Sequence, residues 1–270
     1  MTLPREAAQE VAPWIVALAR IGYVAKAVLY ATVGMLAAQA ALGDGGRTTD
    51  LGGALRSVLH APFGSEMVLV IAVGLAAYAV WRVVAAITDA EGRGSSLKGI
   101  VLRVGSALRG LAHGALALAA FRLRTGSGEG GGERSEDLVS RALDLPGGNW
   151  LVWLAAGGVL VYGGYQLYRA YAAKLGRQLS LAALPGGTER GVIAVCRIGI
   201  AARGIVFVVI GFLLARSAAR RDPGQAGGVR ESLEVLAGMG RWPLAVVALG
   251  LVAYAVYELV NARYRRVRVA

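Results

Sequence analysis

The hydrophobic positions of this 270-residue chain gather into six runs of about 20 residues, the length a helix needs to cross a bilayer. The runs lie near 21–42, 66–88, 100–121, 149–173, 192–215 and 242–262, and charged residues concentrate between them. A helix satisfies its own backbone hydrogen bonds in lipid. The pattern therefore predicts an all-α integral membrane protein with six transmembrane helices.

Each pair of runs forms one copy of a two-helix unit. The first helix opens with Arg-x-Gly and carries a second basic residue six positions after the arginine, and the second helix carries Gly followed four residues later by Tyr. Three copies of this order indicate an internal triplication. We therefore expect repeat units at 14–90, 96–174 and 190–264, an N-terminal tail at 1–13 and a basic C-terminal tail at 265–270. The three units are expected to surround a pseudo-threefold axis.

The recurring glycines and tyrosines are expected to mark helix contacts, because small residues let membrane helices approach closely. Each first-helix glycine shares a helix face with the basic residue four positions later. The predicted packing positions are Gly22, Gly105, Gly199, Gly74, Gly158, Gly250, Tyr78, Tyr162 and Tyr254.

The inner basic residues of the first helices are Lys26, Arg109 and Arg203. One turn further along the same face stand Tyr30, His113 and Phe207. Two interpretations stay open for the basic residues: they point into the bundle as structural or functional groups, or they snorkel to the headgroups as topology anchors.

One second-helix position differs between the units, which carry Arg82, Gln166 and Glu258 there. The difference indicates either a designed polar site or drift at a helix end near water. A lone carboxylate inside the membrane is costly, so we predict that Glu258 pairs with Arg203 of its own unit. The alternative places Glu258 at the cytoplasmic water boundary, where it needs no partner.

The linkers inside the units, near 50–62, 136–146 and 231–243, read as short amphipathic helices on the membrane surface. Of the 29 basic residues 18 lie on the opposite side with both termini, against 6 of the 17 acidic residues, while the linkers are balanced. Cytoplasmic segments carry the excess of Lys and Arg. Both termini are therefore predicted to be cytoplasmic and the linkers extracytoplasmic.

This distribution accounts for the formal net charge of +12 without a nucleic-acid partner. The expected partners are the lipid bilayer and its anionic headgroups on the cytoplasmic side, and the sequence singles out no protein partner. Only 3 of the 29 basic residues are lysines, a usage that suggests a GC-rich bacterial genome. The expected location is the bacterial inner membrane.

No motif indicates catalysis or a cofactor. A phosphate loop, His-Glu-x-x-His and Gly-x-Ser-x-Gly are all missing from the sequence, and a single cysteine, Cys196, excludes a multi-cysteine metal site. His60 falls in a linker and His113 inside a helix, which argues against a haem held by both. We expect no catalytic residue, cofactor or metal, and we expect His113 to be a core residue with a hydrogen-bonded ring.

The Arg-x-Gly openings and the Gly-x-x-x-Tyr-x-x-aromatic second helices resemble a bacterial membrane family known as domain of unknown function 1206. Its members are similar in carrying three tandem two-helix units, and the resemblance covers nearly the whole chain. It implies membrane residence and no established activity, so it supplies no catalytic residues. The chain departs from its own pattern at His113, Phe207, Gln166 and Glu258.

Two classes of function compete. Because no catalytic constellation is visible, the first expectation is a non-enzymatic membrane protein with a structural, envelope or stress-related role. The alternative is a translocator of a small solute or ion, built around the pseudo-threefold axis as in mitochondrial carriers. That analogy concerns the fold alone, and the Pro-acid-basic signature of the carriers is absent from the ends of the first helices.

Overall fold

The structure, a computed structural model, describes residues 13–43, 46–89, 92–127, 135–172 and 188–264. Residues 1–12 of the predicted tail at 1–13, and the whole predicted tail at 265–270, lie outside this description. Six long helices carry the apolar runs: α1 (Pro13–Leu42), α3 (Gly64–Ile87), α4 (Leu97–Arg124), α6 (Gly148–Ala172), α8 (Thr188–Arg220) and α10 (Arg241–Tyr264). Each is long and apolar enough to cross a membrane, so the predicted six-helix membrane fold in three units is confirmed.

Short helices stand between the long helices of each unit, where the sequence predicts amphipathic segments. They are α2 (Leu51–Leu59), α5 (Ser135–Leu143) and α9 (Val229–Gly238), with a 3₁₀ turn, η2 (Pro223–Gln225), before α9. The helix α2 begins after Asp50, whose side chain accepts a hydrogen bond from the Gly53 amide at 2.7 Å. This contact satisfies one of the amides left free at a helix start.

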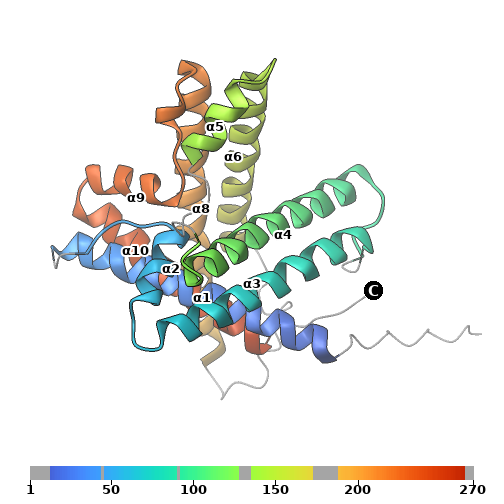
Figure 1. Ribbon diagram of the computed structural model, residues 1–270, viewed down its shortest axis with the longest axis vertical. Helices are drawn as coiled ribbons and strands as arrows, with labels where there is room; N and C mark the ends of the chain where they lie inside the picture. The colour runs from blue at the N-terminus through green and yellow to red at the C-terminus, as the bar shows by residue number, and fades with distance from the viewer. Residues whose placement is uncertain (1–12, 44–45, 90–91, 128–134, 173–187, 265–270) are drawn as a thin grey trace, which may run out of the picture.

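The three units join one another through three close helix pairs, α1 with α10, α3 with α4 and α6 with α8. Figure 1 shows these pairs diverging in three directions from a common centre. Within the first unit α1 packs on α3, and within the third α8 packs on α10. The contacts thus follow a ring, α4–α3–α1–α10–α8–α6, which fits the predicted arrangement about one axis.

The ring is open inside the second unit. Over the described residues, α4 and α6 do not pack on each other as the paired helices of the first and third units do. The short helix α2 packs on both long helices of its unit, and α9 does the same, whereas α5 packs on α6 and η2. The helix α4 therefore belongs with the first unit in space, while α5 and α6 belong with the third.

The glycines at the predicted contacts are tightly packed in the first and third units but not in the second. A Cβ placed on Gly22 would stand 2.7 Å from Tyr78 Cβ, and one on Gly199 would meet the backbone of Tyr254, so both glycines lie in tight helix contacts. An added Cβ on Gly105 or Gly158 would meet no described atom within 4 Å. The prediction that Gly105 and Gly158 lie at helix contacts is wrong, because the facing helix of their unit stands apart.

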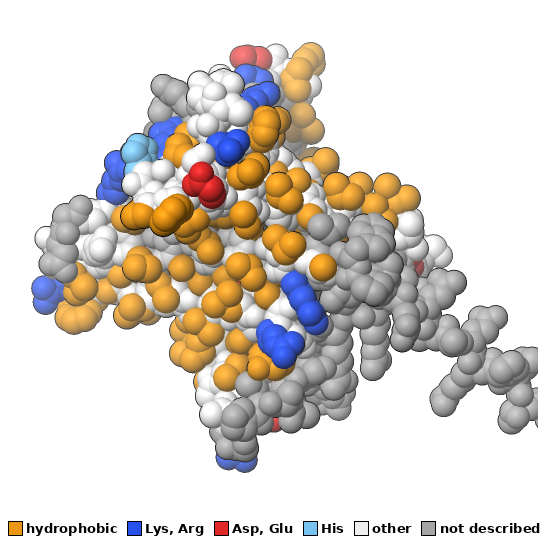
Figure 2. Space-filling model, turned by 60° about the horizontal axis from the view of Figure 1, so that its bottom comes forward, with side chains coloured by type: hydrophobic (Ala, Val, Ile, Leu, Met, Phe, Trp, Pro, Cys, Tyr) orange, Lys and Arg blue, Asp and Glu red, His pale blue; other side chains and the backbone are white. Residues whose placement is uncertain are grey.

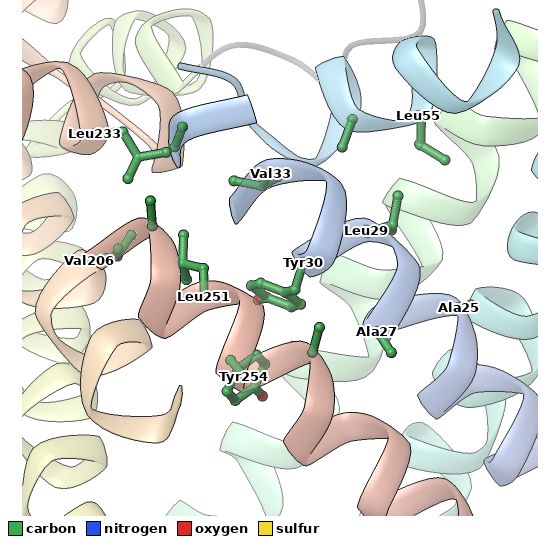
Figure 3. Packing of buried hydrophobic residues seen from close by; sticks show 14 of the residues in the cluster. Ala25, Ala27, Leu29, Tyr30, Val33, Leu55, Val206, Leu233, Leu251 and Tyr254 are labelled. Atoms are coloured by element: carbon green, nitrogen blue, oxygen red, sulfur yellow. The ribbon is translucent and has the colours of Figure 1, made fainter. Parts of the chain in front are cut away.

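Four of the five remaining predicted packing positions lie inside the bundle, and the fifth, Tyr162, is half-buried. Gly74 faces Ile21 of α1 and Gly250 faces Ala202 of α8, while Tyr78 and Tyr254 are both buried. Most of the buried apolar residues form one cluster between the first and third units, where α1, α10 and α8 meet beneath α2 and α9. Figure 3 shows Tyr30 of α1 lying close to Leu251 and Tyr254 of α10 in this cluster, while Leu29 of α1 points toward Leu55 of α2.

The outer surface of the helices is apolar. Figure 2 shows hydrophobic side chains covering much of one face of the molecule. Exposed side chains such as Val80, Leu111, Leu154 and Phe212 come from four different long helices. An apolar belt of this kind is what hydrocarbon tails solvate well, in contrast to the interior described next.

Candidate functional site: a polar pocket shared by six helices

A polar pocket with a cavity volume of about 40 Å³ lies where the six long helices converge. Each long helix contributes one charged side chain to its lining. These are Lys26 of α1, Arg82 of α3, Arg109 of α4, Arg169 of α6, Arg203 of α8 and Glu258 of α10. Among the described residues that line the pocket, Glu258 is therefore the one carboxylate facing five cationic groups.

Glu258 is paired with Lys26 and not with Arg203. The Lys26 ammonium lies 2.7 Å from Glu258 Oε1, and both side chains are buried. The predicted pairing of Glu258 with Arg203 is thus wrong, because α1 packs directly on α10 and brings its own basic residue to the carboxylate. The other oxygen, Oε2, is buried without a hydrogen-bond partner among the described atoms.

Arg203 is buried in an aromatic enclosure. Its Nε donates a hydrogen bond to the Tyr30 hydroxyl at 3.0 Å, and one terminal nitrogen donates to the Tyr162 hydroxyl at 3.0 Å. The guanidinium carbon lies 4.8 Å from the ring centre of Phe207 and 5.0 Å from that of Tyr254. Aromatic faces attract cations, so the enclosure holds this charge with phenols and rings.

Two further arginines use the same chemistry. Arg82 Nε donates to the Tyr78 hydroxyl at 3.0 Å, and Arg169 donates to the Tyr257 hydroxyl. The Lys26 ammonium also lies 4.9 Å from the ring centre of Tyr78. Tyrosines thus surround the basic groups and orient them around the pocket.

The basic residue of the open unit is placed differently from its repeat equivalents. Lys26 and Arg203 are buried, whereas Arg109 is only half-buried. Its Nε donates to the Gly105 carbonyl at 2.9 Å, one turn back along its own helix. Arg109 therefore borders the space between α4 and α6 as well as the pocket.

His113 follows one turn after Arg109 on α4 and also lines the pocket. Its Nδ1 donates to the Arg109 carbonyl at 2.7 Å, since a carbonyl oxygen can only accept. The imidazole centre lies 4.9 Å from the Tyr78 ring centre. The ring is thus hydrogen-bonded and packed on an aromatic neighbour.

Gln166 and the outer arginines complete the candidate polar positions. Gln166 is buried, and its Cβ faces Gly204 on α8. Arg20 and Arg197 are exposed, while Arg103 donates 2.8 Å hydrogen bonds to the carbonyls of Ala86 and Ile87 at the end of α3. The outer arginines therefore lie away from the pocket.

Sequence reasoning missed Arg169 and Asn261, two pocket residues at equivalent positions of α6 and α10. Arg169 had entered only the count of basic residues on the side of the termini, and Asn261 had not been considered. Each follows the Gln166 or Glu258 position by three residues, a spacing that returns to nearly the same helix face. That spacing is the signal that identifies them. No group of three or more His, Cys, Asp or Glu side chains suited to a metal occurs in the described ranges.

Six apolar helices in three repeated units define a multi-pass membrane protein with a polar centre. The chain belongs to the family described as Domain of Unknown Function (DUF1206), whose model matches residues 21–89, 104–173 and 198–265. It is 32% identical over 264 residues to the uncharacterized protein YxxB of Bacillus subtilis (strain 168), covering 95% of this chain and 94% of that protein. No solved structure matches the chain. The family resemblance seen in the sequence is confirmed.

Proposed function

We propose that this membrane protein is not an enzyme and that its central pocket binds an anionic group. The single observation that carries the proposal is the lining itself, in which each of the six long helices contributes a charged side chain and five of the six are basic. Cationic groups at this depth are costly unless a partner or water compensates them. The pair with Glu258 compensates Lys26, whereas Arg109 and Arg203 donate to neutral oxygen atoms among the described residues.

Arg109 and Arg203 are the groups best placed to meet an anion. The hydrogen bonds given above tie Arg203 to two phenols and Arg109 to a backbone carbonyl, all of which are neutral acceptors. A guanidinium offers two parallel N–H groups to a phosphate or carboxylate. An anion in the pocket would add the attraction between opposite charges to guanidinium hydrogen bonds whose present acceptors are neutral.

Translocation of that anion is the second candidate. In many transporters the substrate site lies within the membrane at the interface of internal repeats, and here three repeats share one pocket. The competing proposal is a purely structural role in the envelope, in which the polar cluster only fastens the helices together. Binding and flux measurements separate these possibilities.

The test uses the whole protein in nanodiscs of neutral lipid, with inorganic phosphate and acetate as probes. Binding is expected to raise the melting temperature and to be lost in Arg109→Gln. The matched control is Arg197→Gln, which removes an exposed arginine from an equivalent first helix. If neither probe binds, or if both variants bind like the parent protein, the anion site is refuted. Flux of the bound probe into liposomes would then support translocation over simple binding.

We also propose that both termini lie in the cytoplasm of a bacterium and that the basic residues on that side contact anionic headgroups of the inner membrane. The concentration of basic residues on the side of the termini supports this orientation. The same distribution supports lipid headgroups rather than nucleic acid as the partner of the basic surface.

A further inference from the structure

The gap between α4 and α6 is specific to the second unit. At repeat-equivalent positions, a neighbouring helix packs against Gly22 and Gly199, while the space beside Gly105 is open. The second helices show the same contrast, since Gly74 and Gly250 face a neighbour and Gly158 does not. The interface is thus closed in the first and third units and open in the second.

The walls of the gap are apolar. On α4 the exposed side chains of Val101, Leu102 and Leu108 flank the helix face of Gly105. On α6 Leu151 and Leu154 flank the face of Gly158 and are also exposed. They lie near the start of α6, whereas Val101 and Leu102 lie near the start of α4, at the other end of the gap, because consecutive spans run in opposite directions. These residues suit the hydrocarbon chain of a lipid better than water or a charged solute.

The gap leads to cationic groups. Arg109 lies one turn after Gly105 on the same face of α4, lines the central pocket and is half-buried. It stands 10 residues beyond Gly99, where its span begins, which is about 15 Å below the helix end at 1.5 Å per residue. A guanidinium exposed to lipid at that depth is costly, so an anionic headgroup beside it would be stabilising.

A second polar group in the pocket calls for a hydrogen-bond donor. Glu258 Oε2 is buried without a partner among the described atoms, in a residue that is 1% exposed. Buried polar atoms normally have a hydrogen-bond partner. A ligand that carries a hydroxyl or ammonium group beyond its phosphate would serve both Arg109 and Glu258.

We propose that the gap between α4 and α6 admits a membrane phospholipid, whose phosphate binds Arg109 and whose headgroup donor reaches Glu258 Oε2 in the central pocket. The acyl chains lie against the exposed apolar faces of α4 and α6. This inference rests on the proposed anion site and names its ligand. The bound lipid differs from lipids attracted to the basic surface, because its headgroup lies inside the helix ring.

Native mass spectrometry of the detergent-purified full chain tests the proposal. The probe is phosphatidylglycerol, which carries a phosphate and hydroxyls, and one molecule is expected to stay bound to each chain. Phosphatidylcholine has the phosphate without the donor, and diacylglycerol has the chains and a hydroxyl without the phosphate. Both are expected to be retained at least tenfold less. Equal retention of all three lipids would refute headgroup recognition.

Two variants locate the bound lipid. Gly158→Phe fills the gap and Arg109→Gln removes the phosphate partner, so each is expected to lower phosphatidylglycerol retention at least tenfold. Gly164→Phe is the matched control, because Gly164 also has open space but lies on another face of α6. If Gly158→Phe reduces folding yield, Gly105→Leu fills the same gap from α4. Retention unchanged by gap-filling variants would overturn lateral entry.

Inorganic phosphate distinguishes the two levels of the proposal. If phosphate binds in an Arg109-dependent manner while phosphatidylglycerol does not, the anion site stands and the lipid assignment fails. If neither binds in that manner, the anion site itself is wrong. If phosphatidylglycerol binds far more tightly than phosphate and only its binding is blocked by Gly158→Phe, the lateral entrance is supported.

Discussion

The ammonium of Lys26 and the carboxylate of Glu258 join the first and the last long helix of the chain, with Nζ and Oε1 2.7 Å apart. Both residues are buried, and both line the central pocket. The pair therefore fixes the position of α1 relative to α10 at the centre of the molecule.

Loss of either partner is expected to be strongly destabilising, because the other charge would be left buried. We expect Lys26→Gln and Glu258→Gln each to lower the free energy of unfolding by about 3 to 5 kcal/mol. The double variant should cost much less than the sum of the two. Denaturant unfolding in mixed micelles, arranged as a double-mutant cycle, measures the coupling. A cycle of Glu258→Gln with Arg197→Gln should be additive within about 0.5 kcal/mol.

Bulk at equivalent glycines is expected to have opposite consequences in different units. Gly199→Leu drives a side chain into the backbone of Tyr254. We therefore expect the free energy of unfolding to fall by about 1 to 3 kcal/mol, the usual cost of overpacking a core. Gly105→Leu enters open space and should leave the melting temperature in detergent nearly unchanged. Equal effects of the two substitutions would mean that α4 packs on α6 after all.

The phenols that hold Arg203 are expected to contribute to stability separately. Tyr30→Phe and Tyr162→Phe each remove one hydrogen bond to a charged group, worth about 1.5 to 3 kcal/mol. Tyr165→Phe is the control on α6, since that side chain is half exposed at the surface. Thermal unfolding of the three variants makes the comparison, and a shift for Tyr165→Phe as large as for Tyr162→Phe would contradict it.

The proposed orientation predicts a labelling pattern. In a Cys196→Ala background, a cysteine at Gly238, at the end of α9, should react with a membrane-impermeant maleimide on intact cells. A cysteine at Ser95, between α3 and α4, should react only after the cells are opened. Both positions are exposed. The reversed pattern would place the termini outside the cell.

Much of the fold follows from local patterns that the chain repeats. The six runs, the Arg-x-Gly openings and the shared face of Gly22, Lys26 and Tyr30 depend on length and on helical periodicity alone. These features predicted the helices and their units. They also singled out most of the charged residues that meet in the pocket, because interior faces of membrane helices carry the polar groups.

The sequence did not predict which basic residue pairs with Glu258. Three similar units offer three inner basic residues to one carboxylate, and the contact between α1 and α10 decides for Lys26 over Arg203. The open interface was equally hidden, since Gly105 and Gly158 look like their packed equivalents. Whether a helix packs against a given glycine depends on where the neighbouring helix lies, and a local sequence pattern does not contain that information.

The ion pair between Lys26 and Glu258 can form only late in the synthesis of the chain. Chains are made from the N-terminus, so α1 enters the membrane with an ammonium whose counter-charge is carried by α10, which is synthesised after the other five long helices. Until α10 arrives, that charge has to be tolerated through water, headgroups or the insertion machinery. A chain that stops before Glu258 therefore keeps the Lys26 ammonium in the bilayer without its counter-charge.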